Sequence, residues 1–526
     1  MQSMKILVEQ IKVSINSADE EIFELAKARI RKTRAFSYVY SCRIHKRSID
    51  ARKKDEIKFV CTVCVEAECL YKGNIDEVLK NHNMKAVREE EISFKALKKP
   101  KKSPLVVGFG PAGMFCALAL ARAGLNPIVI ERGADVDSRI SDVEKFYTSK
   151  MLDINSNVQF GAGGAGTSSD GKLTTRINDP KCDFVLKTFF DYGAPEDILY
   201  KAKPHIGTDN LCNIVKNIDS EIRRLGGKIY YNTQLLSFYN GKAITNNGDF
   251  EYSSIVLAIG HSARDTYAYL LSQGFAIEPK PFSVGVRVEH LQQDINEAMF
   301  GKYASDKRLG AAEYNISHRK DGKGVYSFCM CPGGEVMAAA SEDGGVVVNG
   351  MSKFARDGIN ANSAIVVQVD RDDYGNDPKK AIDFQRMLER NAFIKAGSNY
   401  KAPIQTMGDF YNDKAKNYPT KVFPTYMNGD VTVCNMNTVL PKFVCDYLKL
   451  GFNEFGKKIR GFDDPATVIT GVETRTSAPL RILRNENYTA FSHFDVYPCG
   501  EGAGYAGGIM SAAVDGINVA LAILNK

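Results

Sequence analysis

The sequence predicts a mixed α/β protein in two parts, a small N-terminal α+β unit and a larger body built around a parallel sheet. Strand-like and helix-like periods alternate over the first hundred residues. Glycine is almost absent there, because only Gly73 of the 44 glycines precedes residue 103. Directly afterwards, an apolar strand runs into a glycine turn and an Ala-rich helix, which is typical of a βαβ unit. We therefore expect a domain boundary near residue 100.

The N-terminal unit is expected to have the order βαββαβ, which predicts a ferredoxin-like sandwich over residues 1–98. The expected strands cover residues 4–15, 36–44, 57–66 and 87–94. The expected helices cover residues 22–30 and 74–82. Ser17, with Glu20 three residues later, suits the N-cap and capping box of the first helix. Residues 99–103, rich in lysine around Pro100, are expected to form an exposed linker.

Length and composition exclude several classes of protein. A chain of 526 residues with 44% hydrophobic and 25% charged residues is long enough for two to four domains and has the composition of a globular protein. No apolar stretch approaches the roughly 20 residues that span a bilayer, and no secretory signal is recognisable, so we expect a cytoplasmic protein with no membrane association. Twelve cysteines without paired Cys/His spacing predict reduced thiols and no metal site.

The net charge of +7 lies entirely in the N-terminal unit, because residues 1–102 hold 23 Lys and Arg against 15 Asp and Glu. Basic residues gather at 29–34 and 43–47, with Phe36, Tyr38 and Tyr40 between them. Such a pattern is one footprint of nucleic-acid binding. Basic runs are more often solvated faces, so contact with nucleic acid is the less favoured hypothesis.

The strongest single signal is the segment 104–133, a strand, a glycine turn, a helix and a second strand. Gly108 permits the tight turn, Gly110 lets the backbone approach a pyrophosphate, and Gly113 lets the helix lie close to the sheet. Glu131, at the end of the second strand, is placed to accept a hydrogen bond from a ribose hydroxyl. The segment predicts a Rossmann-like dinucleotide-binding unit. Its expected contacts are Gly108, Gly110, Pro111, Ala112, Gly113, Glu131 and Arg132.

The same glycine pattern occurs twice more, in different surroundings. Residues 161–166 follow no strand, so we expect a flexible loop whose free backbone N–H groups suit a phosphate. Residues 495–509 form a strand that runs into glycines and then a helix over 510–524, which again presents a helix N-terminus to an anion. Neither match completes a second βαβ unit with its acidic residue.

Together these motifs resemble the two-dinucleotide-binding-domain flavoproteins and, more narrowly, a bacterial family of uncharacterised FAD-dependent dehydrogenases. The resemblance covers nearly the whole chain and rests on residues 107–113, 163–173, 257–264, 329–334, 472–477 and 500–509. It implies an extended FAD, with its ADP at the first glycine turn and its ribityl chain and ring near the other two glycine segments. The further contacts that it implies are Gly163, Gly164, Ala165, Gly166, Asp170, Lys172, Ala258, Gly260, Gly500, Glu501, Gly504, Gly507, Gly508 and Ile509. Two departures from the wider superfamily are Ile259, within an Ala-Ile-Gly segment in place of Ala-Thr-Gly, and Glu501, where Asp is common.

The resemblance also implies a discontinuous layout. The FAD domain is expected over residues 104–280 and 491–526, with a β-rich cap over 281–490 between its two parts. The expected cap strands cover residues 282–289, 325–331, 334–340 and 364–369, and a helix is expected over 443–461. The cap should cover the flavin ring and shape the substrate pocket.

The candidate catalytic residues are Cys329, Cys331, His261 and Arg475. Each has a structural alternative: the two cysteines read first as small buried core residues, the histidine as a turn residue, and the arginine equally well as the partner of a carboxylate. The CxxC pair Cys61 and Cys64 lies within a predicted strand and not at a helix N-terminus, so a redox role there is disfavoured.

The preferred function is an FAD-dependent oxidoreductase that uses hydride transfer at flavin N5 on an unidentified small molecule. Without a second complete nucleotide-binding unit, NAD(P)H is expected only as a transient electron donor, and reduction by the organic substrate itself is the alternative. An RNA-modifying flavoprotein that uses the basic N-terminal unit, and a flavin-binding protein without turnover, are the other hypotheses.

Overall fold

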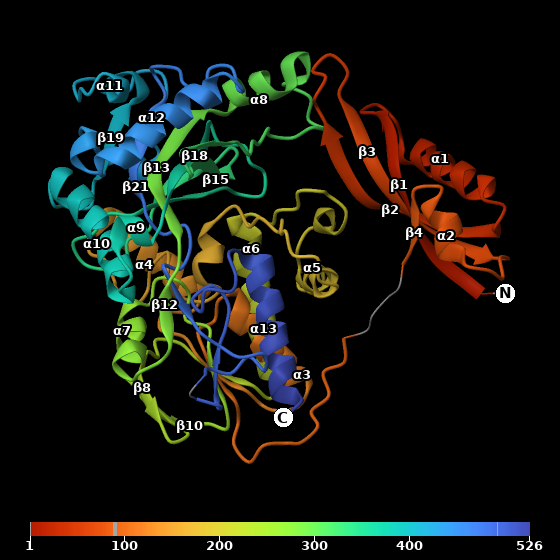
Figure 1. Ribbon diagram of the computed structural model, residues 1–526, viewed down its shortest axis with the longest axis horizontal. Coiled ribbons are helices and arrows are strands. Elements are labelled where there is room, and N and C mark those ends of the chain that lie inside the picture. The colour runs from red at the N-terminus through yellow and green to blue at the C-terminus, as the bar shows by residue number, and fades with distance from the viewer. Residues whose placement is uncertain (1, 88–91, 492) are drawn as a thin grey trace.

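The computed structural model describes residues 2–87, 92–491 and 493–526. Figure 1 shows a small N-terminal unit beside a larger body. The unit consists of β1 (Gln2–Ser14), α1 (Asp19–Lys32), β2 (Phe36–Asp50), β3 (Lys58–Cys69), α2 (Ile75–Lys80) and β4 (Met84–Ala86). Its strands form an antiparallel sheet in the order β2-β3-β1-β4, so the order of elements agrees with the expected βαββαβ.

Two details of this unit differ from expectation. The last strand is the short β4, and not residues 87–94, of which 88–91 lie outside the described residues. Helix α1 begins after Ala18, without a side-chain cap from Ser17. Asp19, Glu20 and Glu21 in its first turn instead place negative charge at the positive end of the helix dipole.

The lower part of the body in Figure 1 is organised around a parallel sheet of five strands in the order β23-β11-β5-β6-β7. These are β5 (Leu105–Val107), β6 (Ile128–Ile130), β7 (Lys228–Tyr230), β11 (Ile255–Leu257) and β23 (Val496–Pro498). Helix α3 (Pro111–Arg122) packs against the C-terminal helix α13 (Ile509–Leu524), and apolar side chains bury most of both helices. The sheet therefore joins the first glycine turn to the last segment of the chain.

The upper part contains a seven-stranded sheet in the order β14-β15-β18-β13-β21-β19-β20. Its strands are β13 (Phe282–Leu291), β14 (Ser317–Lys320), β15 (Lys323–Cys331), β18 (Asn360–Val369), β19 (Ala402–Thr406), β20 (Val431–Val433) and β21 (Val468–Glu473). Helices α10 (Pro378–Lys395) and α12 (Lys442–Gly456) pack against this sheet. The β-rich character expected for this region is present, and the expected helix over 443–461 ends earlier, at Gly456.

The remaining elements connect these two sheets. The other helices are α4 (Val136–Ser149), α5 (Lys181–Asp191), α6 (Thr208–Arg224), α7 (Arg264–Ser272), α8 (Gln292–Phe300), α9 (Arg371–Tyr374) and α11 (Met407–Tyr411). The other strands are β8 (Leu235–Tyr239), β9 (Lys242–Thr245), β10 (Gly248–Glu251), β12 (Ile277–Pro279), β16 (Glu335–Ala338), β17 (Val348–Met351) and β22 (Leu480–Ile482). Short 3₁₀ turns lie at Gly164–Ser168, Glu196–Leu199, Gly301–Tyr303, Tyr426–Gly429 and Met436–Thr438.

The N-terminal unit contacts the body near the C-terminal end of β2 and also through Arg308, whose guanidinium donates to the Ile15 carbonyl at 3.2 Å. The Arg47 N–H donates to the Tyr200 carbonyl at 2.7 Å, and the Ala202 N–H donates to the Arg47 carbonyl at 2.9 Å. The Arg47 guanidinium pairs with Asp19 and lies 5.6 Å from the centre of the Phe59 ring. One residue of the basic 43–47 run is thus engaged within the protein.

Within the described residues, no helix is both long and apolar enough to cross a membrane. The same part of the chain has no group of three His, Cys, Asp or Glu side chains arranged to hold a metal ion.

Candidate functional site

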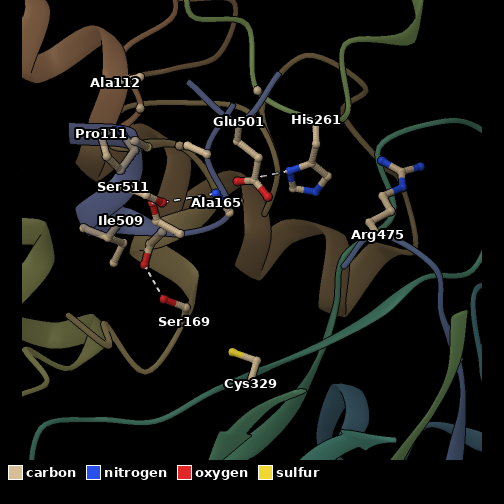
Figure 2. Close-up of a pocket in the computed structure, with 18 of the residues that line it drawn as sticks. Pro111, Ala112, Ala165, Ser169, His261, Cys329, Arg475, Glu501, Ile509 and Ser511 are labelled. Carbon is tan, nitrogen blue, oxygen red and sulfur yellow. Dashed lines mark hydrogen bonds and ion pairs between the residues drawn. The ribbon is translucent and has the colours of Figure 1, made fainter. Parts of the chain in front are cut away.

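A cavity of about 830 Å³ lies between the parallel sheet and the seven-stranded sheet. The glycine turn after β5 and the start of α13 line one end of it, and residues of β15 and the segment after β21 line the other. Figure 2 shows Pro111, Ala112, Ala165 and Ile509 gathered at the first end, with Cys329 and Arg475 apart from them.

The glycine turn has the geometry that its sequence predicts. Gly108 has a φ of +100°, and a Cβ there would lie 2.3 Å from the Ala258 carbonyl oxygen. A Cβ on Gly113 would lie 1.9 Å from the Gly108 carbonyl oxygen, so this glycine lets α3 pack directly on the turn. Gly110 differs, because a Cβ there would have only the Gly164 Cα nearby, at 3.7 Å. The space in front of Gly110 belongs to the cavity.

Glu131 follows β6 and lines the cavity, but protein groups already bind its carboxylate. Oε2 accepts from the Phe109 N–H at 2.8 Å, and Oε1 accepts from the N–H groups of Gly133 and Gly161 at 2.9 and 3.0 Å. The side chain is only 5% exposed. Glu131 therefore holds three loops together at this end of the cavity, a role that the ribose interpretation did not include.

The second glycine segment is an ordered turn, where a flexible loop was expected. Its anchor is Arg139, a buried residue of α4. The Arg139 guanidinium donates to the carbonyls of Asn157, Val158, Ala162 and Gly164 at 2.8 to 2.9 Å. Burial lowers the pKa of Arg139 to about 10, so it stays cationic at neutral pH. Sequence reasoning missed this residue because an arginine on an amphipathic helix normally faces water.

The third glycine segment leads into the N-terminus of α13. A Cβ on Gly507 or Gly508 would meet no atom within 4 Å, and both residues line the cavity. Gly500 is instead held inside the fold, where its N–H donates to Asp515 Oδ2 at 2.7 Å. A Cβ on Gly504 would lie 2.7 Å from the Leu480 carbonyl oxygen. Of these four glycines, only Gly507 and Gly508 leave space for a ligand next to the backbone.

His261 and Glu501 form a pair in the middle of the cavity wall (Figure 2). His261 Nδ1 lies 3.8 Å from Glu501 Oε2. The histidine is 9% exposed, and its Nε2 has no hydrogen-bond partner among the described residues. His261 does lie in the turn after β11, as expected, but it is buried and not at the surface, so a ring nitrogen without a partner among the described residues is left in the cavity wall.

Arg475 is buried and paired with a carboxylate, as one of its two interpretations proposed. Its guanidinium contacts Glu389 at 3.1 and 3.0 Å and also donates to Ser341. Glu389 binds Arg264 on its other side at 2.8 and 2.9 Å. Burial opposes ionisation of Glu389, but the two guanidinium groups outweigh it and lower its pKa far below the usual range. One edge of Arg475 still lines the cavity.

Cys329 and Cys331 lie on β15 at a bulge, where the register with β18 shifts between Phe328 and Cys331. Cys329 has a φ of +44° and lines the cavity, whereas Cys331 is fully buried. The Cys331 thiol donates to the Cys329 carbonyl at 3.3 Å. Arg287 Nη1 donates to the same carbonyl at 3.1 Å. The bulge therefore separates two cysteines that a regular strand would place side by side.

Most of the expected site residues line the cavity. They are Gly108, Gly110, Pro111, Ala112, Glu131, Arg132, Gly164, Ala165, Gly166, Asp170, Lys172, Ala258, Gly260, His261, Cys329, Arg475, Glu501, Gly507, Gly508 and Ile509. Five do not line it: Gly113, Gly163, Gly500, Gly504 and Cys331. Asp170 is only 1% exposed and is paired with Arg356, whose Nε donates to it at 3.0 Å. Sequence reasoning missed Arg356 and Glu473, which line the cavity. It also missed Arg139, Arg264, Arg287 and Glu389, which bind lining residues, or each other, from behind.

Comparison with known proteins adds a relative and two family matches. The chain is 47% identical over 493 residues to an uncharacterised protein of Clostridium beijerinckii, which covers 92% of each chain. The chain belongs to the family of this clostridial protein. Residues 281–476 match the family described as FAD-dependent protein, C-terminal domain-like, and residues 5–66 match a domain of unknown function.

Solved structures give weaker likenesses. Glycine oxidase from Geobacillus kaustophilus is 10% identical, with 80% of this chain and 94% of that chain covered and a TM-score of 0.34. The protein CtdE in complex with FAD is 10% identical, with 81% and 84% covered and a TM-score of 0.31. A geranylgeranyl bacteriochlorophyll reductase-like protein from Thermoplasma acidophilum is 12% identical, with 80% and 78% covered and a TM-score of 0.34. Likenesses with such low TM-scores establish neither fold nor function for this family member.

Proposed function

We propose that the protein is an FAD-dependent oxidoreductase, a dehydrogenase or reductase that acts on a small organic molecule in the cavity. The observation that carries this proposal is the continuity of the cavity from the dinucleotide-type glycine turn to the polar groups His261, Cys329 and Arg475. The match of residues 281–476 to an FAD-dependent family supports the same cofactor.

The residues along the cavity fit an extended dinucleotide. Gly110, Gly507 and Gly508 each leave open space where a side chain would otherwise stand. Backbone N–H groups at the starts of α3 and α13 favour phosphate through both hydrogen bonding and the helix dipole. FAD supplies hydride exchange at flavin N5 when it is bound.

The protein's own residues would orient the substrate and control protons. His261 Nε2 is a buried nitrogen without a partner among the described residues, so it can donate to or accept from a group in the cavity. Glu501 Oε2 lies 3.8 Å from Nδ1 on the other side of the ring, so the carboxylate helps to orient the imidazole. Arg475 is fixed by Glu389, so it presents a rigid polar edge to the substrate.

The proposal is tested by a matched pair of glycine variants. Gly110→Ala adds a methyl group that contacts the protein only at 3.7 Å, so the fold should persist while bound flavin falls at least about tenfold. Gly113→Ala places a methyl group 1.9 Å from a backbone oxygen and should destabilise the fold itself. Absorbance and chromatography of the released cofactor measure the flavin, and thermal unfolding measures the fold. A colourless wild-type protein that gains stability only with NAD would contradict the proposal.

We further propose that NADH or NADPH visits the same cavity and leaves before the substrate enters, which gives ping-pong kinetics. The support is that neither additional glycine segment completes a second nucleotide-binding unit. Anaerobic mixing with each nucleotide tests this: rapid loss of oxidised-flavin absorbance supports it. No loss with either nucleotide would assign reduction to the organic substrate.

At the level of domains, we propose that residues 1–98 are a ferredoxin-like domain and that residues 281–490 are the cap of a dehydrogenase. The antiparallel order β2-β3-β1-β4 and the seven-stranded sheet over the cavity support these assignments.

A further inference from the structure

Charged side chains gather where the cavity wall meets the bulge in β15. Lys172 connects this group to the bulge, because its ammonium donates to the Met330 carbonyl. Cys329, at the same bulge, lies apart from Pro111 and Ala112 in Figure 2. The group, which we call the cationic cluster, consists of six side chains that line the cavity: Lys172, Arg176, Lys203, Arg356, Asp170 and Glu313.

The ion pairs within the cationic cluster leave positive charge in excess. Asp170 accepts from Arg356 Nε at 3.0 Å and lies 3.6 Å from Lys172. Glu313 pairs with Lys203 at 2.8 Å and with Arg356 at 3.5 Å. Three cations therefore share two carboxylates, and one positive charge remains before Arg176 is counted.

Arg176 adds a second positive charge to the same wall. Every residue from Lys172 to Ile177 except Leu173 lines the cavity, so Arg176 belongs to a continuous stretch of the wall. Its side chain is exposed, and it has no hydrogen bond or ion pair with any other residue in the described ranges 2–87, 92–491 and 493–526. The guanidinium can therefore turn toward a ligand without breaking a contact within the protein.

The pKa values of two neighbouring groups agree with this excess. Burial would raise the pKa of Glu313, but the charges of Lys172, Lys203 and Arg356 outweigh burial and lower it. Burial and the charge of Arg356 lower the pKa of His205, so its ring is neutral at neutral pH. The cationic cluster thus favours negative charge and disfavours a further cation.

The other charged groups of the cavity wall lie outside the cationic cluster. Glu473 is paired with Arg287, and Arg475 is paired with Glu389, so these two ion pairs are close to neutral. Glu501 lies beside His261, on the glycine segment before α13. The pyrophosphate of an FAD would meet the starts of α3 and α13, so it too leaves the cationic cluster without a partner.

We propose that the cationic cluster is a binding site for a small organic anion, and that the substrate of the proposed oxidoreductase carries its negative charge there. The substrate role rests on the proposed function, whereas the anion site follows from the cluster itself. Arg176 supplies the cation that has no partner in the protein, and Lys203 is 60% exposed. Thr174 and Asn315 add uncharged hydrogen-bond donors to the same wall.

The requirement for negative charge is tested with succinate and succinamide, which share one carbon skeleton. Isothermal titration calorimetry of the full-length protein measures both affinities. We expect succinate to bind at least about tenfold more tightly than succinamide at low ionic strength, because only the carboxylates can neutralise the cluster. The difference should shrink as salt is added.

Matched variants test the location of the site. Arg176→Gln removes one positive charge and should weaken succinate binding about threefold, whereas Glu313→Gln removes one negative charge and should strengthen it about threefold. Arg460→Gln changes an exposed arginine that does not line the cavity, so its affinity should equal that of the wild type. Effects of opposite sign exclude misfolding as their cause, since misfolding would weaken binding in both variants.

Equal affinities for succinate and succinamide, binding of neither, or equal succinate affinities in Arg176→Gln and Glu313→Gln would overturn the inference. ADP-ribose, the part of NADH without nicotinamide, tests a different occupant. If ADP-ribose binds with the same dependence on the variants and succinate does not bind, the cluster serves a visiting nucleotide and the substrate assignment is wrong.

Flavin absorbance of the same samples separates the two proposals. A yellow protein that does not bind succinate would contradict the anion site alone. A colourless protein that binds succinate with the expected dependence on the variants would contradict the proposed function and leave the anion site in place.

Discussion

The two walls of the cavity differ in whether backbone groups or charged side chains form them. The wall formed by the parallel sheet is mostly backbone: the glycine turn after β5, the turn held by Arg139, and the start of α13. The wall formed by the seven-stranded sheet and the segment after β21 includes Glu473 and Arg475, whose buried charges are paired with Arg287 and Glu389 behind them. The first wall suits a ligand recognised by close approach of peptide groups, and the second suits reactive groups whose charge must be controlled.

This difference predicts unequal sensitivity to substitution. The buried charges of the backbone wall, Glu131 and Arg139, are bound by several peptide groups each. A buried ion pair that loses one partner instead leaves a charge without compensation. Substitutions in the wall with buried ion pairs should therefore lower stability first, and those in the backbone wall should weaken ligand binding first.

The largest effect is expected for Glu389→Gln. This change leaves the buried guanidinium groups of Arg264 and Arg475 without their shared carboxylate, so the free energy of unfolding should fall by about 3 to 5 kcal/mol. Chemical denaturation measures the loss. The matched control is Glu454→Gln, since that carboxylate pairs with Lys457, which is 62% exposed, and its loss should cost about 1 kcal/mol or less. Equal losses for the two variants would show that the buried cluster does not depend on its shared carboxylate.

The two walls also differ in how far the sequence could predict them. The glycine turn, the strand before it and the helix after it follow from local spacing, and the structure has them at Leu105–Arg122 with the expected close packing at Gly108 and Gly113. The Arg264–Glu389–Arg475 cluster joins α7, α10 and the segment after β21, which only tertiary folding brings together. No local pattern distinguishes such residues from solvated charges, so Glu389 and Arg264 were missed.

The next effect concerns pH and His290, on the same strand as Arg287. Burial lowers the pKa of His290 to about 4, while the unfolded chain has a value near 6.5. Between these values the unfolded state binds a proton that the folded state does not, so stability falls as the pH falls, by about 3 kcal/mol at pH 4. Above pH 6.5 the group is neutral in both states and has no effect.

The variant His290→Gln removes this titration and can still donate to the Phe462 carbonyl, which the ring contacts at 2.8 Å. Its free energy of unfolding, measured from about pH 4 to 7, should change less with pH than that of the wild type. Parallel curves for the two proteins would show that His290 is not the titrating group.

A smaller effect on stability is expected for Arg139→Lys in the backbone wall. Lysine keeps the charge but cannot reach four carbonyls at once, so about 2 kcal/mol should be lost together with much of the bound flavin. Arg460→Lys, on an exposed residue, is the control. Retention of flavin by Arg139→Lys would mean that the ordered turn is not needed for binding.

The smallest effect is expected from removal of the N-terminal unit. Every residue that lines the cavity lies at or after Val107, and the unit contacts the body mainly through Arg47 at Tyr200 and Ala202 and through Arg308 at Ile15. A chain that begins at Ser103 should therefore keep its flavin, with affinity within about twofold of the full-length protein, because neither wall loses a contact with the ligand. Titration of the apoprotein with FAD measures this, and thermal unfolding shows whether the body still folds cooperatively. A colourless or insoluble product would place the true boundary elsewhere and make the N-terminal unit part of the support of the cavity, since Lys203 and Pro204 of the cavity wall directly follow the segment that β2 holds in place.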